Sequence, residues 1–267
     1  SKCKSVVFAP EDYASSNAPP DSDLALEYAY GYSGECRRKV QIGCNAVWSL
    51  DGQRALYPTA GLVVSHDLSS NTQSFFEGHA ETGESVTAIA RHPFQDVFAT
   101  GQAGKRPRVC VWTLVGDATS SVADLQLPSG SRFVSLVRFS PCGNILLTLG
   151  ADEGHTFTLW DWQKAAPLLT QRAGASPVFA LEFHPTLVVL AAPSTDERTP
   201  RLSDLGPGDA HYAFVSCGYR CIKFWTLTLD QEASATSGAV SNSASNHSSP
   251  SKNKSSAHMK KWRCDGY

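Results

Sequence analysis

Short strand-like segments that end in tryptophan or histidine recur along this chain at nearly regular intervals. Residues 156–160 alternate apolar and polar side chains, the pattern of a strand with one buried face, and end at Trp160. Similar segments end at Trp112 and Trp225, and an earlier one ends at His66. His66 and Trp112 are 46 residues apart, and Trp112 and Trp160 are 48 residues apart. A repeat of this length predicts that one structural unit is used several times.

The interval between Trp160 and Trp225 is longer, at 65 residues. It contains residues 191–211, which are rich in Pro, Asp, Gly and Arg; we interpret them as a 21-residue surface loop, without which the interval is 44 residues. A period in the middle forties fits four antiparallel strands per unit, and the ending Trp160-Asp161 is typical of the third strand in a WD-type β-propeller blade. We therefore predict an all-β chain built from WD40-type blades.

About four such units fit between residues 24 and 229. Turn signals such as Asp51-Gly52 separate the short apolar segments. Fourth strands are predicted at 73–76, 123–127 and 168–171. No stretch shows an apolar period near 3.6 residues, so helix is expected to be scarce. Closed WD rings usually need more blades, and we therefore predict a partial, open propeller whose outermost sheets have unpaired edges.

Composition divides the chain into four parts. Residues 1–23 are interpreted as a short strand and a polar linker, and 24–229 as a motif followed by the blades. Ten serines with almost no large apolar residue fall within 230–259, so this part is predicted to be a disordered insertion or tail that cannot offset its ordering entropy. Residues 260–267 are predicted to begin a further strand.

Length, charge and cysteine usage argue against several classes of protein. Of 267 residues, 42% are hydrophobic and 18% are charged, and a net charge of −2 gives no global basic signature of nucleic-acid binding. No run approaches the roughly 18 apolar residues of a membrane span, and the N-terminus lacks a signal-peptide core. The eight cysteines include no Cys-x-x-Cys pair, which favours reduced thiols in the cytosol over a disulfide framework. The first residue is not Met, so we interpret the chain as a piece of a longer protein.

Residues 24–38 have the most unusual composition of the chain. Tyr28, Tyr30 and Tyr32 alternate along an extended segment with an aromatic face, and neighbouring glycines permit sharp turns. This run resembles the hydrophobic motif (the HELP motif) that precedes the propeller in the echinoderm microtubule-associated protein-like family. The matching residues are Leu26, Glu27, Tyr28, Tyr30, Gly31, Tyr32, Gly34, Cys36 and Arg37. Two departures are visible: Tyr28 stands where tryptophan is usual, and the spacing from Gly34 to Cys36 is one residue short.

The resemblance continues through the blades, with short matches such as Glu77-Gly78-His79 and Phe183-His184-Pro185. It implies two fused atypical propellers, with the motif packed into the fold. It also implies a cytoplasmic protein of the cytoskeleton that binds tubulin in microtubules. The motif tyrosines are accordingly expected to act through folding, and removal of the Tyr30 ring is expected to cost about 3–5 kcal/mol if that ring is fully buried.

The blades are predicted to contain structural hydrogen-bond networks, because a buried indole N–H requires an acceptor. In the second blade His79, Thr100 and Trp112 stand where an imidazole, a hydroxyl and an indole form such a chain. The usual Asp is missing from the turn 103–105, so this network is expected to be incomplete. The candidates in the later blades are Thr148, Asp152, Trp160 and Trp225.

No arrangement typical of catalysis, cofactor binding or metal ligation is found. Residues 101–106 resemble a phosphate loop, but Ala99 stands where the first Gly should be, and Arg106 replaces the Ser or Thr that binds the metal. The histidines are dispersed, and no nucleophile elbow or zinc-ligand spacing appears. Gly154-His155 falls inside a predicted hairpin turn and is a false match to the Gly-His of a blade. We therefore predict a protein that is not an enzyme and uses no cofactor or metal.

Two basic clusters are the candidate partner-binding residues. They consist of Arg37, Arg38 and Lys39, and of Lys105, Arg106 and Arg108. Tubulin surfaces and tails are acidic, so these clusters would supply an attraction that weakens with salt. The alternative is that such short charged runs only solvate loops.

Three hypotheses about function remain open from the residues. The first is a non-catalytic protein that binds microtubules through a larger propeller assembly. The second is a WD-repeat scaffold that joins protein complexes without contacting tubulin, and with no nucleic acid or membrane as partner. The third, which the residues favour least, is an enzyme-associated propeller whose chemistry lies on other sequence.

Overall fold

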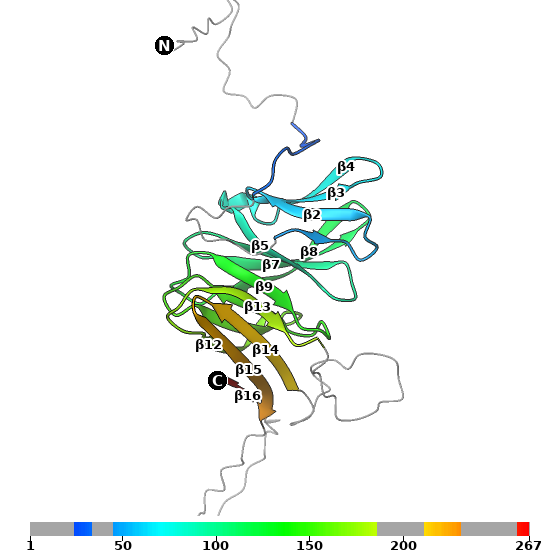
Figure 1. The fold of residues 1–267 in the computed structure, drawn as a ribbon. Helices are drawn as coiled ribbons and strands as arrows, with labels where there is room; N and C mark the ends of the chain where they lie inside the picture. Colours follow the sequence, from blue (N-terminus) through cyan, green and yellow to red (C-terminus); the bar gives the residue numbers. More distant parts are fainter. Residues whose placement is uncertain (1–23, 34–44, 186–210, 231–260, 267) are drawn as a thin grey trace, which may run out of the picture.

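The computed structural model describes residues 24–33, 45–185, 211–230 and 261–266 (Figure 1). Within these ranges the chain forms sixteen β-strands in four antiparallel sheets of four strands each, together with one short 3₁₀ helix, η1 (Ala80–Thr82). The prediction of an all-β fold made of WD40-type blades is therefore confirmed.

Each sheet consists of four strands that follow one another in the sequence and pair in that order. The first sheet contains β1 (Val47–Trp48), β2 (Arg54–Thr59), β3 (Leu62–Asp67) and β4 (Thr72–Phe76). The second contains β5 (Val86–Arg91), β6 (Val97–Gln102), β7 (Arg108–Val115) and β8 (Ala118–Gln126). The third contains β9 (Val134–Phe139), β10 (Leu146–Gly150), β11 (Thr156–Asp161) and β12 (Ala166–Arg172). The fourth contains β13 (Val178–Phe183), β14 (His211–Gly218), β15 (Cys221–Asp230) and β16 (Lys261–Gly266).

The burial of a strand depends on its place in its sheet. All residues of β6 and of β10 are buried, because sheets pack on both faces of these strands. Their sequences are correspondingly apolar or small on both faces. The outermost strand β12 has no buried residue: Leu168 and Leu169 are half-buried, and Pro167, Thr170 and Arg172 are exposed. The apolar runs that predicted the strands thus mark the middle of each blade.

Hairpin turns begin where the sequence indicates them. At Asp51-Gly52, the Asp51 carboxylate accepts a hydrogen bond from the Gln53 backbone N–H at 3.0 Å and from the Ser49 hydroxyl at 2.5 Å. Gly52 has φ +72°, a conformation that side chains disfavour. This turn connects β1 to β2 and sets their register, in which Trp48 pairs with Ala55.

The predicted fourth strands of the first three blades overlap β4, β8 and β12, although residue 127 lies beyond the end of β8. The fourth blade takes its outermost strand from a distant part of the chain, because β16 pairs with β15 from Trp225↔Gly266 to Asp230↔Lys261. The sequence indicated a strand near residue 260 but gave no sign that it would complete this sheet.

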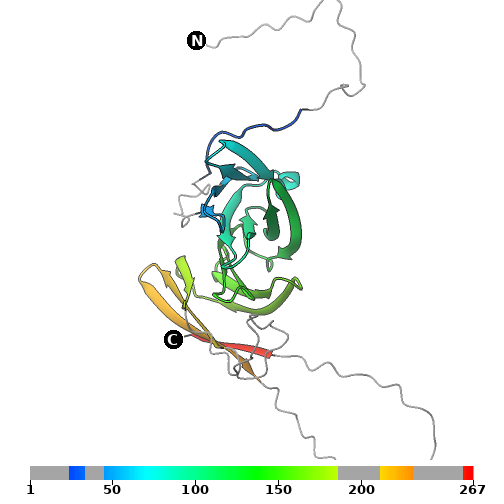
Figure 2. The same cartoon turned by 90° about the vertical axis from the view of Figure 1, so that its right-hand side faces the viewer.

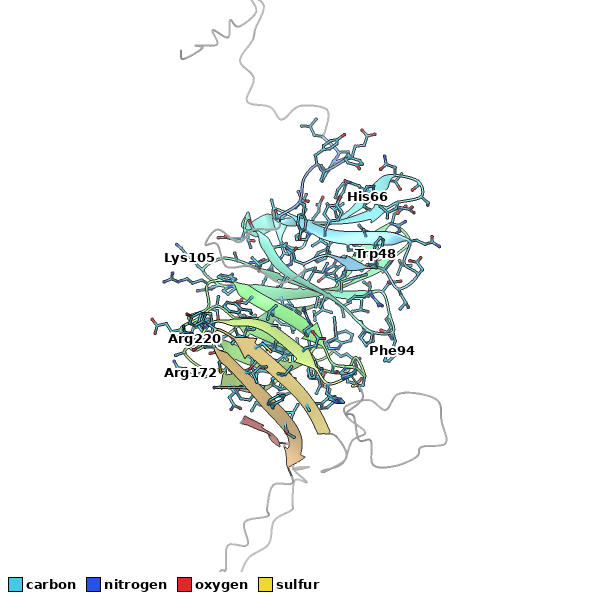
Figure 3. The ribbon with its side chains drawn as sticks, viewed as in Figure 1. Trp48, His66, Phe94, Lys105, Arg172 and Arg220 are labelled. Atoms are coloured by element: carbon cyan, nitrogen blue, oxygen red, sulfur yellow. The ribbon has the colours of Figure 1, made fainter. Side chains whose placement is uncertain are left out.

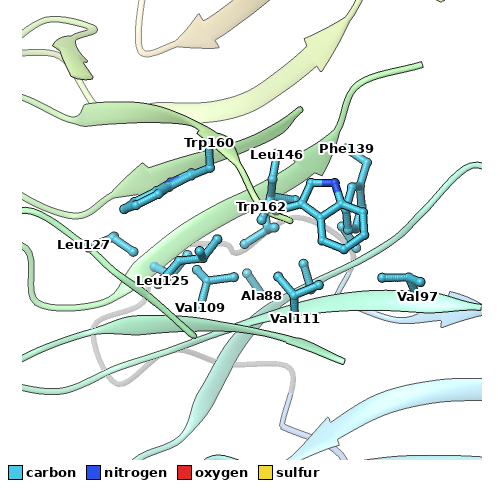
Figure 4. Close-up of a cluster of buried hydrophobic side chains, with 14 residues drawn as sticks. Ala88, Val97, Val109, Val111, Leu125, Leu127, Phe139, Leu146, Trp160 and Trp162 are labelled. Carbon is cyan, nitrogen blue, oxygen red and sulfur yellow. The ribbon is translucent and has the colours of Figure 1, made fainter. Parts of the chain in front are cut away.

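The core lies in the spaces between successive sheets, where three clusters of buried apolar side chains are found. The cluster between the second and third sheets includes Val111 and Trp160 (Figure 4). In each space the tryptophan of a third strand faces the preceding sheet. Trp112 stacks on Phe76 of the first sheet with 4.4 Å between ring centroids, and Trp225 meets Phe157 of the third sheet at 4.9 Å.

The sheets are arranged as an open arc. In the described residues the main contacts join neighbouring sheets, through β2 with β5, β5 with β9, and β9 with β13 near the inner edge, and through β4 with β8 and β12 with β16 at the outer edge. Figures 1 and 2 show the four sheets following one another from the N-terminal blade to the C-terminal blade. The outer faces of the first and fourth sheets therefore have no neighbouring blade in this part of the chain.

Candidate interaction surfaces

The second sheet contains a buried hydrogen-bond network around His79. The imidazole is fully buried, and its Nε2 lies 2.8 Å from the Thr100 hydroxyl. The indole Nε1–H of Trp112 donates to the same hydroxyl at 3.2 Å. The structure therefore brings together all three residues that the sequence singled out in this blade.

A fourth member, Gln102, was missed by the sequence analysis. Its Oε1 lies 2.6 Å from His79 Nδ1, and its side chain is only 2% exposed. Gln102 follows Thr100 by two residues on β6, so both side chains emerge on the same face of the strand. That spacing is the signal that could have identified it, because a strand residue can take the place of the Asp missing from the turn.

The partners of His79 determine its protonation. Because the Gln102 carbonyl oxygen can only accept, Nδ1 is assigned the hydrogen and Nε2 accepts from the Thr100 hydroxyl. Burial lowers the pKa of His79, and the hydrogen bond to Gln102 only partly opposes this effect. The imidazole is therefore neutral and lies between two neutral partners.

Arg108 belongs to the same neighbourhood and is occupied internally. Its guanidinium forms an ion pair with Asp124 at 2.5 Å and donates to the Gly78 carbonyl at 2.7 Å. Its Nε also lies 3.5 Å from Gln102 Oε1. The sequence grouped Arg108 with the partner-binding residues, but these contacts direct its side chain toward the blade. Lys105 and Arg106 differ, because both are exposed in the turn between β6 and β7 (Figure 3).

Reduced versions of the network recur in the third and fourth sheets. Trp160 Nε1–H donates to the Thr148 hydroxyl at 2.9 Å, and Trp225 Nε1–H donates to the Ser216 hydroxyl at 2.9 Å. The same register holds in all three sheets. The hydroxyl residue pairs across the strands with a residue of the third strand, and the tryptophan lies two residues after that pairing residue. Ser216 was missed because the hairpin between β14 and β15 is shorter, which places it nine residues before its tryptophan instead of twelve.

Asp152 does not join the network of the third sheet, contrary to the sequence expectation. Its carboxylate accepts hydrogen bonds from the Thr156 backbone N–H at 2.8 Å, the Thr156 hydroxyl at 2.7 Å and the Gly154 N–H at 3.1 Å. Burial alone would raise the pKa of Asp152, but the bonds from Thr156 lower it below its usual value. Asp152 therefore caps its own turn. His155 lies in that turn with φ 44°, as expected for a false Gly-His match.

Four cysteines whose side chains are described are free thiols. They are Cys110, Cys142, Cys217 and Cys221. Cys217 pairs across the hairpin with Ile222, and Cys221 pairs with Gly218, so the two thiols project from opposite faces of the sheet. Burial raises the pKa of Cys110 to about 12. Among the described residues no group of three His, Cys, Asp or Glu side chains is placed to hold a metal ion.

The aromatic motif lies on the outer face of the first sheet, where a preceding blade would pack. Its backbone is fixed by hydrogen bonds: Ser33 N–H donates to the Pro58 carbonyl at 2.9 Å, and Ala29 N–H donates to Gln73 Oε1 at 2.8 Å. The Tyr28 ring meets the edge of His66, the residue that replaces tryptophan in this sheet, with 6.0 Å between centroids. Gly31 has φ +103°, which requires glycine.

The large side chains of the motif are more exposed than the family resemblance implied. Tyr30 is 85% exposed, Tyr32 is 56% exposed and Leu26 is 46% exposed, whereas Tyr28 is half-buried. The expectation of a motif packed into the fold is therefore wrong for these side chains, because no described sheet covers this face. Glu27 is also exposed. The remaining predicted residues, Gly34, Cys36, Arg37, Arg38 and Lys39, lie outside the described part of the chain.

Nothing in the described part of the chain combines helical structure with the length and apolarity that a membrane crossing requires.

Comparison with known proteins identifies relatives over most of the chain. No protein-family model matches it. Human echinoderm microtubule-associated protein-like 1 is 29% identical over 219 residues, which is 78% of this chain and 23% of the relative. Echinoderm microtubule-associated protein-like 4 of Xenopus laevis is 30% identical over 236 residues, 82% of this chain and 22% of the relative. Echinoderm microtubule-associated protein-like 2 of Rattus norvegicus is 28% identical over 219 residues, which is 78% of this chain and 28% of the relative.

The chain thus spans about a quarter of the length of the curated relatives that it matches. The identities to proteins 1, 4 and 2 of this group are nearly equal, so they do not single out one of these proteins as the counterpart of this chain. The resemblance that the sequence motifs indicated is confirmed: over about four-fifths of its length this chain is similar to echinoderm microtubule-associated protein-like proteins.

Proposed function

We propose that this protein is a non-catalytic, microtubule-associated protein of the cytoplasm and that it binds tubulin through an assembly of propeller blades. The observation that carries the proposal is the similarity, over about four-fifths of the chain, to relatives that are named as microtubule-associated. The buried networks around His79, Thr148 and Ser216 support a structural and not a catalytic use of these residues.

The tubulin contact is assigned to exposed basic residues, of which Lys105 and Arg106 are described. Both are exposed in a hairpin turn at the end of the second sheet, and Figure 3 shows Lys105 there. Attraction between such residues and an acidic filament surface acts over about one Debye length and is screened by salt. Arg108 is left out of the contact because its ion pair with Asp124 engages it within the blade.

Co-sedimentation of the complete protein with polymerised tubulin over a salt series tests this proposal. We expect binding that weakens as salt rises, and a further loss of roughly two- to fivefold for each of Lys105→Glu and Arg106→Glu. Lys164→Glu is the control for charge reversal at the opposite end of the sheets: the Lys164 side chain is 64% accessible and forms an ion pair with Asp161 at 2.9 Å, so this variant also loses that pair. Circular dichroism establishes that each variant is folded. Absence of binding at low salt would contradict the proposal.

A scaffold that binds other proteins is the second candidate, and the outer face of the fourth sheet favours it. Ile222 is 59% exposed and Phe224 is 51% exposed on β15, whereas Val109 and Val111 at the corresponding positions of β7 are fully buried by the next sheet. An apolar face of this kind suits another protein surface. The scaffold function replaces the first proposal if two results are found together. The wild-type protein does not bind microtubules, and it binds a partner protein in stoichiometric amount that the double variant Ile222→Ser, Phe224→Ser no longer binds.

A further inference from the structure

A cleft opens at one end of the third sheet, between the two linkers that connect it to its neighbours. Its volume is about 620 Å³, and its lining includes Ser129, Arg132, Ser135, His155, Arg172 and Val178. Arg132 belongs to the linker between β8 and β9, and Arg172 ends β12, so 40 residues of sequence separate two arginines that the fold brings to one cleft.

Both arginines are available to a ligand. They are exposed, and neither forms an ion pair with any residue in the described part of the chain. Arg172 lies directly over Gly154, where a Cβ atom would come within 2.8 Å of Arg172 Nε. Glycine at this position therefore allows the guanidinium to lie close to the turn. Two carboxylates also line the cleft: Asp152, which accepts hydrogen bonds within its own turn, and Glu153.

Further basic residues surround the cleft. The Gly104 N–H donates to the Arg132 carbonyl at 2.9 Å, which places the turn with Lys105 beside the cleft. On the other side, the Tyr219 N–H donates to the Pro177 carbonyl at 2.9 Å, which places Arg220 there. Figure 3 shows Lys105, Arg172 and Arg220 along the same side of the molecule.

The opposite end of the sheets is acidic. The turns there carry Asp51, Asp67, Asp96 and Asp117, because the first-to-second and third-to-fourth strand turns all fall at that end. Two basic residues at this end form ion pairs: Arg54 with Asp67 at 3.7 Å and Asp117 at 2.7 Å, and Lys164 with Asp161 at 2.9 Å. The cleft end differs, because it carries Arg132 and Arg172 without ion pairs to described residues, together with the carboxylates of Asp152 and Glu153.

We propose that this cleft binds an acidic peptide segment of a partner protein, with Arg132 and Arg172 pairing to its carboxylates. The planar guanidinium groups match carboxylates in geometry as well as in charge. Phe133, Pro177 and Val178 supply apolar lining for the aliphatic parts of such a peptide, and the hydroxyl groups of Ser129 and Ser135 supply hydrogen bonds to its backbone.

The cleft fits a peptide better than a nucleic acid. A nucleic acid needs an extended basic track along its phosphates. Here the basic residues are separated by Glu153 and by the apolar lining, so only spaced negative charges are matched. This proposal rests on the proposed microtubule function for the identity of the partner protein. The acidic character of the bound peptide is inferred from the cleft alone.

The experiment measures fluorescence anisotropy of a fluorescein-labelled hexaglutamate peptide with the full chain at low salt. The variants Arg132→Gln and Arg172→Gln each remove one positive charge. Lys164→Gln is the control that removes one positive charge at the other end of the sheets, together with the ion pair of Lys164 to Asp161. We expect the double variant to raise the dissociation constant about tenfold, which corresponds to about 1.4 kcal/mol. Lys164→Gln should leave the dissociation constant unchanged. Thermal unfolding verifies that the variants are folded.

Other outcomes would overturn the proposal. Absence of peptide binding, or equal weakening by Lys164→Gln, shows that the cleft has no specific role. Equally tight, arginine-dependent binding of a labelled hexamer of deoxythymidine shows a general polyanion site. The two proposals fail separately: peptide binding without co-sedimentation refutes only the microtubule function. Co-sedimentation that is insensitive to Arg132 and Arg172, without peptide binding, refutes only the cleft.

Discussion

Gln102 accepts a hydrogen bond from the buried Nδ1–H of His79 and so takes the place of the aspartate that is missing from the neighbouring turn. The amide reaches the imidazole because it emerges two residues after Thr100 on the same face of β6. With this contact the network runs without interruption from Gln102 through His79 and Thr100 to Trp112. The second blade is therefore completed by a neutral side chain.

Removal of the Gln102 side chain should destabilise the second blade. The variant Gln102→Ala leaves a buried N–H without an acceptor and should lower the free energy of unfolding by about 1–3 kcal/mol. Gln53→Ala is the control, because the Gln53 side chain is exposed and its hydrogen bond is made by the backbone. Urea unfolding measures both variants. Equal stability of the two would show that the His79–Gln102 contact contributes nothing.

The stability of the protein should fall on mild acidification. Burial lowers the pKa of His79 below 6.5, and burial lowers that of His92 as well. The relevant pH window lies between the lowered pKa values of the folded state and about 6.5. Within this window the unfolded chain binds more protons than the native one. The stabilisation is therefore fully present above the window and is lost as the pH falls through it. Hydrogen bonds from Ser69 and Ser70 lower the pKa of Asp67 to about 2, so its contribution is lost only at more acidic pH.

Urea unfolding at pH values of about 7.5 and 5.5 measures this loss within the histidine range. His79→Gln should show a smaller decrease between the two pH values than the wild-type protein, and the decrease that persists should be reduced again by His92→Gln. An unchanged pH dependence in His79→Gln would rule out His79 as a source of the acid sensitivity.

In the fourth blade, Ser216 should be replaceable by threonine but not by alanine. Ser216→Ala leaves the buried indole N–H of Trp225 without its acceptor at 2.9 Å and should cost about 1–2 kcal/mol. Ser216→Thr keeps the hydroxyl, and the second and third sheets carry threonine at the equivalent positions 100 and 148. The midpoints of thermal unfolding distinguish the variants. A Ser216→Thr variant as unstable as Ser216→Ala would show that packing, and not the hydrogen bond, governs this position.

Most of the fold could be predicted because each blade is encoded locally. Strand alternation, hairpin turns such as Asp51-Gly52 and the spacing between tryptophans all depend on residues within one repeat. The partner of each tryptophan was harder to find where hairpin length changed, as for Ser216, because cross-strand register decides which hydroxyl meets the indole.

The features that the sequence did not predict depend on distant parts of the chain. β16 completes the fourth sheet across the intervening residues 231–260. Arg132 and Arg172 share a cleft only because the third sheet stacks between its two neighbours. The exposure of Tyr30 depends on what covers the first sheet, and no local pattern records that.

The exposure of Tyr30 leads to a different expectation from the one based on family resemblance. Tyr30→Ala should lower the free energy of unfolding of this chain by no more than about 0.5 kcal/mol, since most of the ring is already in water. Leu159→Ala, which removes a fully buried side chain between the third and fourth sheets, should cost about 2–5 kcal/mol. Tyr28→Ala should fall between them, because that ring is half-buried against His66. Urea unfolding of the three variants gives the order directly. A loss of about 3 kcal/mol or more in Tyr30→Ala would mean that the ring is buried in solution and that the motif is packed into the fold after all.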